Sequence, residues 1–284
     1  MTVTRNAIAM IGLIVVGGLL ISQAEDRRPT MTLKVDHVEH EGQRSIRVAT
    51  PAATWIYHDK GAGFASLIDN DGADWISYHP KGGSDGKYRG IPNLCHPQGY
   101  FHPGGPNCTT RIVSQADEKV TLESQSKDGK WVCRWDILPD RARLTVVKAD
   151  APYWFLYEGT PGGEVNQGKL DTARGFCLRA DGQRTPLKKK WTGDIQGDGQ
   201  TEWVAFGNTR NGRTLVFIHH NDDKAVDSYW PMQGNMTVFG FGRNGLDKHL
   251  KQTPDHYTVA LIDETDTKKI NATVAKLIES TPEE

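Results

Sequence analysis

Cysteine is scarce in this sequence and occurs only at positions 95, 108, 133 and 177. No two of these residues form a CxxC pair, which argues against a zinc site. Net charge is nearly absent as well, because 34 basic side chains face 35 acidic ones. A chain with this balance has no strong attraction for nucleic acid or for an anionic membrane surface. We therefore expect neither of them as a partner.

Long apolar runs are absent except at the start of the chain. The run of residues 7–21 follows Arg5, and small residues ending at Ala24 separate it from a charged stretch. A membrane span takes about 20 residues, so an uncleaved anchor is the weaker alternative. We predict a signal peptide over residues 1–24, cleaved after Ala24, and a secreted or periplasmic protein. Residues 25–284 then form a single large domain.

Strand–helix–strand alternation is absent too, which argues against a parallel sheet. Short alternating segments separated by turn dipeptides take its place. Residues 119–149 predict three strands joined at Lys-Asp-Gly and Pro-Asp-Arg, with Trp131, Cys133, Trp135 and Ile137 on one face. Residues 63–79 predict a strand, an Asn-Asp-Gly turn and a second strand. Further strands are predicted at 202–207, 214–219, 236–241 and 256–263.

One helix is predicted, at the end of the chain. Ile270, Val274 and Leu277 recur on one helical face behind Thr265 and Asp266, which are suitable N-cap residues. We expect this helix to lie against the outside of a sheet. The fold class is therefore all-β, a large antiparallel β-sandwich with one C-terminal helix.

Three segments resemble the galactose-mutarotase-like proteins. "TWIYHDKGAGFASLIDNDGADWISYHP" is similar to their opening strand and hairpin, and "KYRGIPN" followed by "HPGG" is similar in order to their loop with Arg, Asn, His and a Gly pair. "APYWFLYEGTPGG" resembles their central strand, which carries polar groups into the cleft. The resemblance covers residues 40–263 in element order and implies a β-supersandwich. That fold is shared by aldose epimerases, by domains of polysaccharide lyases and glycosidases, and by non-catalytic binding domains.

The loop of residues 84–105 carries many proton-handling side chains among glycines and prolines, which is typical of a functional loop. A uronate lyase needs donors that neutralise the carboxylate, and Arg89 and Asn93 fit that need. It also needs groups that transfer protons, and Tyr88, His96 or His102 fit that one. We expect Arg89 to face solvent, so that Arg89→Ala abolishes turnover and leaves stability nearly unchanged.

Cys95 and Cys108 bracket most of this loop. In an exported protein such a pair is suited to a disulfide that closes the loop. We therefore expect their Cα atoms to lie within disulfide reach.

An aldose epimerase needs fewer groups: one carboxylate for the anomeric hydroxyl proton and one acid for the ring oxygen. Glu158, with His96 or His219, fits this scheme. Adjacent His219 and His220 must point to opposite faces of their strand, so at most one of them faces a given cleft. Tyr229 and Trp230 offer aromatic faces for a sugar ring, and Arg243 offers bidentate donors to hydroxyls or carboxylates.

The segment "GDIQGDGQTEW" places Asp194 and Asp198 at spacings of a calcium loop. Position 12 of that loop is Ala205, where an EF-hand has a Glu, which excludes an EF-hand. A looser structural calcium site near Asp194, Asp198 and Glu202 stays open beside the simpler interpretation as an Asp-Gly turn. No other metal and no cofactor is expected.

The sequence thus predicts an exported carbohydrate-active protein in which Arg89, Asn93 and His96 face one cleft with residues of the later strands. β-Elimination on a uronate-containing polysaccharide is the favoured reaction. An aldose epimerase or glycosidase is the first alternative, and a non-catalytic glycan-binding protein is the second. The expected catalytic residues are Tyr88, His96, Glu158 and His219, and the expected substrate-binding residues are Arg89, Asn93, His102, Tyr229, Trp230 and Arg243.

Overall fold

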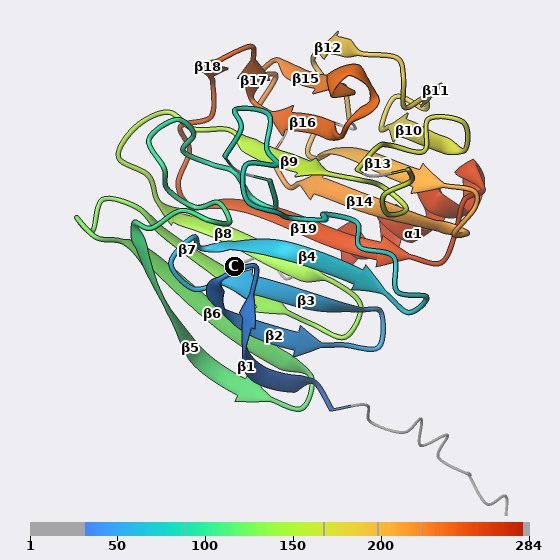
Figure 1. The fold of residues 1–284 in the computed structure, drawn as a ribbon. Helices are drawn as coiled ribbons and strands as arrows, with labels where there is room; N and C mark the ends of the chain where they lie inside the picture. Colours follow the sequence, from blue (N-terminus) through green and yellow to red (C-terminus); the bar gives the residue numbers. More distant parts are fainter. Residues whose placement is uncertain (1–31, 88, 167, 198, 222, 281–284) are drawn as a thin grey trace, which may run out of the picture. The chain divides into compact units, whose positions relative to one another are not determined.

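Nine antiparallel strands form the largest sheet, in the order β11-β10-β13-β14-β19-β8-β7-β6-β5 (Figure 1). The computed structural model describes residues 32–87, 89–166, 168–197, 199–221 and 223–280. The strands of this sheet are β5 (Cys108–Ala116), β6 (Lys119–Ser126), β7 (Val132–Ile137), β8 (Ala142–Lys148), β10 (Gly175–Arg179), β11 (Arg184–Pro186), β13 (Glu202–Asn208), β14 (Arg213–His219) and β19 (Asp255–Ile262). The three-strand meander predicted over residues 119–149 is therefore confirmed.

Two four-stranded antiparallel sheets, β1-β2-β3-β4 and β12-β15-β16-β9, complete the strand layers. Their strands are β1 (Lys34–His40), β2 (Gln43–Ala49), β3 (Ala53–His58), β4 (Gly63–Asp69), β9 (Phe155–Gly159), β12 (Trp191–Gly193), β15 (Asp227–Trp230) and β16 (Thr237–Phe241). A 3-10 turn, η1 (Met232–Gly234), precedes β16, and a short hairpin of β17 (Arg243–Asn244) and β18 (Asp247–Lys248) follows it.

Residues 90–93 join these two smaller sheets, in the loop that Figure 1 shows between β4 and β9. Ile91 exchanges backbone hydrogen bonds with Phe64 of β4 at 2.6 and 3.1 Å. On the other side Glu158 N donates to Gly90 O at 3.0 Å, and Asn93 N donates to Leu156 O at 2.9 Å. The middle of the predicted functional loop therefore also pairs with strands on both of its sides.

Gly90 is required at this link. Its φ is +153°, and a Cβ there would lie 2.3 Å from the Pro103 ring and 2.5 Å from Phe64 O. Only glycine allows the segment to pass this close to both neighbours.

The main core holds the inward side chains of the nine-stranded sheet and of both smaller sheets. On β7, Cys133, Trp135 and Ile137 are fully buried, as the alternation predicted. On the opposite face of this sheet, β10, β13, β14 and β19 are covered by the helix α1 (Thr267–Glu279), whose Ile270, Val274 and Leu277 join a second apolar cluster. Asp266 caps the helix by accepting from the backbone amides of Lys268 and Lys269. The predicted helix, its cap and its position are thus confirmed.

The hairpin expected over residues 63–79 was half wrong. β4 forms, but the residues after its turn form no second strand: they make an isolated bridge between Ile68 and Asp74 and backbone hydrogen bonds from Trp75 N to Leu67 O and from Tyr78 N to Ala65 O. The Asp74 carboxylate accepts hydrogen bonds from the backbone amides of Leu67 and Ile76. Because this side chain accepts the hydrogen bond of Leu67 N that a backbone carbonyl would accept in a regular hairpin, no second strand forms after the turn.

The expected disulfide between Cys95 and Cys108 was wrong as well. All four cysteines are buried free thiols, and burial raises the pKa of Cys108 to about 11. Backbone hydrogen bonds hold both cysteines instead: Cys108 N donates to Lys60 O at 3.0 Å, and Cys95 O accepts from Gly99 N at 3.2 Å in a local turn. Both thiols therefore act as small apolar side chains in the core.

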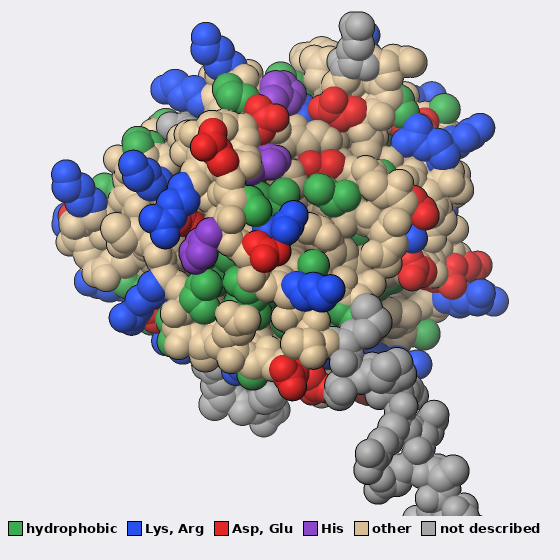
Figure 2. All heavy atoms as spheres, turned by 60° about the horizontal axis from the view of Figure 1, so that its bottom comes forward, with side chains coloured by type: hydrophobic (Ala, Val, Ile, Leu, Met, Phe, Trp, Pro, Cys, Tyr) green, Lys and Arg blue, Asp and Glu red, His purple; other side chains and the backbone are tan. Residues whose placement is uncertain are grey.

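The expected signal peptide, residues 1–24, lies outside the described residues. In the described part of the chain, no helix has the length and hydrophobicity that a membrane span requires. Figure 2 shows one face of the molecule, on which basic and acidic side chains are interspersed rather than separated by sign.

Candidate functional site

The outer face of the β12-β15-β16-β9 sheet carries the candidate site. Tyr157 points into the main core and packs on Phe206 and Phe217, so its neighbour Glu158 points to the other face. In the strand register Glu158 lies opposite Val238, and Val238 lies opposite Trp230. Glu158 and the half-buried Trp230 therefore occupy one row on the same outer face.

Arg243 reaches the same face from β17. Its side chain lies over Gly240 of β16, where a Cβ would come within 2.9 Å of the Arg243 stem. Its Nη1 donates to Ser228 Oγ at 3.3 Å, and its guanidinium lies 5.3 Å from the centre of the Trp154 ring. The absence of a side chain at Gly240 is what lets Arg243 lie between Glu158 and Trp154.

The loop of residues 84–105 covers this face. The Ser84 hydroxyl donates to Glu158 Oε1. The next residue, Asp85, lies with Oδ2 at 2.8 Å from His96 Nε2, and the His96 ring stacks on Trp154 with centres 6.2 Å apart. One turn of the loop therefore contacts both candidate proton-transfer groups. We call Ser84, Asp85, His96, Glu158, Trp230 and Arg243 the Glu158 site.

Glu158 is fully buried, and burial raises the pKa of its carboxyl to about 7. The hydrogen bond from Ser84 lowers that pKa, whereas the nearby charge of Asp85 raises it. A carboxyl group with this pKa can both take up and release a proton near neutral pH, which general acid–base catalysis requires. Arg243 supplies positive charge beside it, although burial lowers the pKa of that guanidinium.

Two polar atoms of the site are buried without a hydrogen-bond partner among the described residues: Glu158 Oε2, an acceptor, and Arg243 Nε, a donor. Buried polar atoms are normally paired, so unpaired ones in a candidate site call for an explanation. The hydroxyl groups of a ligand are both donors and acceptors, so they could pair with either atom.

The structure brings Glu158, His96, Trp230 and Arg243 to one face of the sheet. Asn93 is buried in the link between β4 and β9, and its backbone amide pairs with Leu156. Of the other loop residues proposed for catalysis, Tyr88 lies outside the described residues. His102 is fully buried, and burial lowers the pKa of its imidazole to about 3.

The expectation that Arg89 faces solvent was wrong. Only 2% of its surface is exposed. Its Nη1 donates to Ser77 O at 2.9 Å and to Glu164 Oε1 at 2.8 Å, so the guanidinium is directed into the protein. The expected stability of Arg89→Ala must be corrected accordingly, because the variant would lose a buried ion pair. Arg89 fastens the loop to the turn that follows β9.

Tyr229 does not lie beside its neighbour Trp230. Adjacent strand residues point to opposite faces, and Tyr229 is buried in the main core, where its hydroxyl donates to Leu187 O. Because the two residues are adjacent in a predicted strand, the sequence already indicated that only one of them could contact a sugar on a given face.

His219 points into the main core rather than toward Glu158. Its Nδ1 lies 2.6 Å from Glu202 Oε1 and its Nε2 lies 2.9 Å from Asp255 Oδ1. Burial by itself lowers the pKa of His219, but the two carboxylates outweigh burial and raise it to about 10. Tyr153 and Tyr257 both donate to Asp255 Oδ2. His219 is therefore a stable imidazolium within a buried ionic network.

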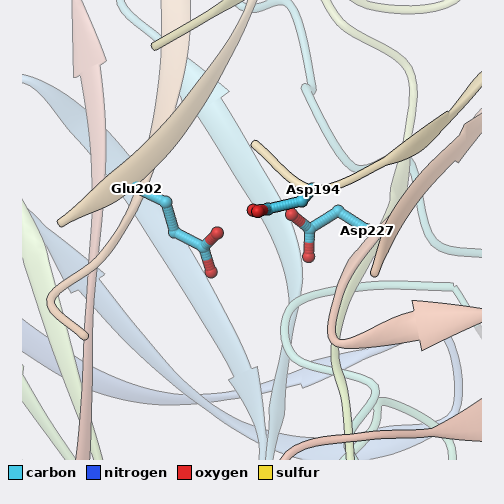
Figure 3. Close-up of side chains that lie close together, drawn as sticks. All are labelled: Asp194, Glu202 and Asp227. Atoms are coloured by element: carbon cyan, nitrogen blue, oxygen red, sulfur yellow. The ribbon is translucent and has the colours of Figure 1, made fainter. Parts of the chain in front are cut away.

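Three carboxyl groups meet at the edge of this network, as Figure 3 shows: Asp194, Glu202 and Asp227. One oxygen from each lies within 4.8 Å of the others, and oxygen donors of this kind suit Ca²⁺. Asp227 also accepts backbone hydrogen bonds from Ile195 and Gly242. Asp198, which the calcium expectation included, lies outside the described residues.

Sequence reasoning missed Ser84, Asp85 and Trp154. Trp154 stands four residues before Glu158, and strand alternation places the two on one face. That signal was present in the sequence. The partners of Ser84 and Asp85 are 74 and 11 residues away in the chain, and no local pattern marks them.

Comparisons with known proteins support the fold. No protein-family model matches the sequence, and no curated protein does. The structure is similar to the crystal structure of HI1317, with a TM-score of 0.53 and 12% identity over 83% of this chain and 98% of that one. It is also similar to the α-N-acetylgalactosaminidase NagBb from Bifidobacterium bifidum, with a TM-score of 0.53 and 15% identity over 82% of this chain and 38% of that one.

A galactose mutarotase related enzyme from Lactobacillus acidophilus matches with a TM-score of 0.43 and 12% identity over 82% of this chain and 99% of that one, and we draw nothing from this lower score. At such identities a likeness shows the fold alone. The all-β antiparallel sandwich with one C-terminal helix, which the sequence predicted, is confirmed.

Proposed function

We propose that this protein is a carbohydrate-active enzyme that interconverts the anomers of an aldose at the Glu158 site. The observation that carries the proposal is the buried Glu158 carboxyl, with a pKa of about 7, whose Oε2 has no hydrogen-bond partner among the described residues. Arg243, whose charge lowers that pKa, has an unpaired Nε as well. The similarity in fold to a glycosidase is consistent with a saccharide ligand but does not choose the reaction.

The reaction needs two proton transfers. A base removes the proton of the anomeric hydroxyl while an acid protonates the ring oxygen, and the ring bond breaks to give the open-chain aldehyde. Rotation about the bond to the aldehyde carbon and the reverse transfers close the ring as the other anomer, so both groups recover their starting states. Glu158 serves as the base and His96, held by Asp85, as the acid. Arg243 stabilises the negative charge that develops on oxygen.

Substrate entry requires Ser84 to leave Glu158, because the carboxyl group is fully buried beneath the loop. The anomeric hydroxyl then donates to Glu158 in place of the Ser84 hydroxyl. The half-buried Trp230, in the same row of the sheet, offers its ring to the apolar face of the sugar.

β-Elimination on a uronate polysaccharide, which the sequence favoured, loses part of its support. Arg89, which with Asn93 was expected to neutralise the uronate carboxylate, is already bound to Glu164 and to Ser77 O. A lyase remains the alternative outcome of the experiment, and a non-catalytic glycan-binding protein is the other.

The test follows the conversion of freshly dissolved α-D-glucose and α-D-galactose by NMR, with and without the protein. We expect acceleration that grows as pH rises through about 7, because the ionised form of Glu158 is the base. Glu158→Gln should reduce the enzymatic rate by about 100-fold or more. Glu118→Gln, at an exposed position, serves as the matched control and should keep it.

A parallel incubation with uronate polysaccharides is read by the ultraviolet absorbance of an unsaturated product. Absorbance that rises while the anomers stay at the uncatalysed rate would replace the epimerase by a lyase. Sugar binding without either reaction would leave a binding protein.

Export is a separate proposal, supported by the charge and length pattern of residues 1–24. Expression of the full chain and sequencing of the exported protein should give Glu25 as the first residue. Retention of residues 1–24 in the recovered protein would contradict it.

A further inference from the structure

The hairpin β17–β18 places two cations directly opposite each other. Arg243 and Lys248 are cross-strand partners in its register. Like charges in this position repel and destabilise a strand pair. Both side chains are half-buried, which strengthens the repulsion because less water screens it.

Both cations also lie over one aromatic ring. The Arg243 guanidinium and the Lys248 ammonium are each 5.3 Å from the centre of the Trp154 ring. Trp154 is almost completely buried beneath them, and its Nε1 has no hydrogen-bond partner among the described residues. The ring faces both cations but cannot neutralise them.

No described carboxylate forms a salt bridge with either cation. Lys248 Nζ donates to the neutral amide of Gln98 at 2.6 Å, and Arg243 Nη1 donates to the hydroxyl of Ser228. Glu158 is the acid that acts on Arg243, and its own raised pKa keeps it largely neutral up to about pH 7. Arg243 also keeps its unpaired Nε. Neither cation therefore has a salt-bridge partner among the described residues.

We propose that Arg243 and Lys248 form a subsite for an anionic group on the saccharide bound at the Glu158 site. A carboxylate, or a sulfate or phosphate ester, would accept hydrogen bonds from the Arg243 fork and from the Lys248 ammonium. It would also remove the repulsion between the two cations. The inference rests on the proposed function for the location of the sugar ring, and it predicts that charged sugars are preferred to neutral ones.

Equilibrium binding tests this inference without requiring turnover. Isothermal titration of the Glu158→Gln protein compares D-glucuronate with D-glucose, which differ in one carboxylate, and glucose 6-sulfate distinguishes an ester from a carboxylate. We expect the preferred anionic sugar to bind at least about tenfold more tightly than glucose, which corresponds to about 1.4 kcal/mol. The preference should weaken with rising ionic strength, because the subsite is only half-buried.

Lys248→Gln should remove most of this preference and leave glucose binding unchanged, and Arg243→Gln should act in the same direction. The matched control is Lys251→Gln, an exposed lysine three residues further along, which should keep the preference. Thermal unfolding of each variant verifies that it is folded. Equal affinity for charged and neutral sugars, a preference that survives Lys248→Gln, or no binding of any of the three sugars would overturn the subsite.

The outcomes separate the two proposals. A charge preference that depends on Lys248, in a protein without anomerase activity, would retain the subsite and reject the proposed reaction. Anomerase activity on neutral sugars, without a preference for charged ones, would retain the proposed reaction and reject the subsite.

Discussion

Glu158 shows how strand alternation determines the chemistry of a side chain. Tyr157 and Gly159 share the inner face of β9, so the carboxylate between them is directed to the outer face, under the loop of residues 84–105. There burial opposes its ionisation, and the hydrogen bonding from Ser84 and the charge of Arg243 do not compensate fully. The same burial that prepares Glu158 for proton transfer must therefore lower the stability of the fold at high pH.

Replacement of Glu158 by Gln should accordingly stabilise the protein above neutral pH. The unfolded carboxyl ionises near its usual pKa of 4.5 and the folded one at about 7, so ionisation favours unfolding increasingly from pH 4.5 to pH 7 and constantly above that. Glu158→Gln removes this effect, and the gain has an upper limit of about 3 kcal/mol at pH 8. Urea unfolding at pH 8 and pH 4.5 measures it. A variant that is less stable than the wild type at pH 8 would show that the charged carboxylate stabilises the fold.

Arg89→Ala should destabilise the protein rather than act on activity alone. The variant leaves Ser77 O without its donor and Glu164 without its cation, and we expect a loss of about 2 to 4 kcal/mol, discounted because Glu164 is partly exposed. Arg44→Ala, whose salt bridge with Asp59 involves a side chain that is 75% exposed, is the control and should cost less than about 1 kcal/mol. Denaturant unfolding compares them. Equal losses in the two variants would show that the buried ion pair contributes no more to the free energy of unfolding than the exposed one.

At the scale of elements, predictability from the sequence depended on whether the signal was local. The meander over residues 119–149 and the capped helix α1 follow from alternation, turn dipeptides and an N-cap, all of which involve neighbouring residues. The strand-like pairing of residues 90–93 could not be predicted, because Phe64 and Glu158 lie far away in the chain. Arg89 was misplaced for the same reason, since Glu164 is 75 residues from it. Glu158 and Arg243 were identified by their chemistry, whereas their position on one face required the register of three strands.

The link of residues 90–93 yields a prediction about two glycines. Gly90→Ala should cost at least about 3 kcal/mol, because the added Cβ collides with Pro103 and with the backbone of Phe64. Gly86→Ala is the matched control: its φ is also positive, at +78°, but a Cβ there meets nothing within 4 Å, so we expect a loss of only about 1 kcal/mol. Thermal unfolding compares the two. A similar loss in both would mean that backbone strain alone, and not the close packing of the link, determines the cost.

At the scale of the whole molecule, burial shifts the pKa of ionisable groups in several separate places. His58, His102 and His220 are each held with a pKa lowered by burial, to about 3, 3 and 4. Burial raises the pKa of Glu158 and of Asp227. Between pH 4.5 and 6.5 these carboxyl groups make the free energy of unfolding fall as pH rises, whereas the histidines make it rise. The pH dependence of stability is therefore a difference between imidazoles that take up protons on unfolding and carboxyl groups that release them.

His58 allows one of these contributions to be isolated. Its Nδ1 accepts from Gly104 N at 3.1 Å, so it can accept a proton there only by losing this contact between β3 and the loop. Below its unfolded pKa of 6.5 the unfolded state binds a proton that the native state does not, so the free energy of unfolding falls as pH falls, down to about pH 3. His58→Asn offers an acceptor in a similar position and cannot titrate. We expect its stability curve between pH 6.5 and 4 to be flatter than that of the wild type by about 1.4 kcal/mol per pH unit, and parallel to it above pH 8, where imidazoles are neutral in both states. Urea unfolding across this range measures both slopes, and parallel curves down to pH 4 would show that His58 takes up its proton without opening the loop.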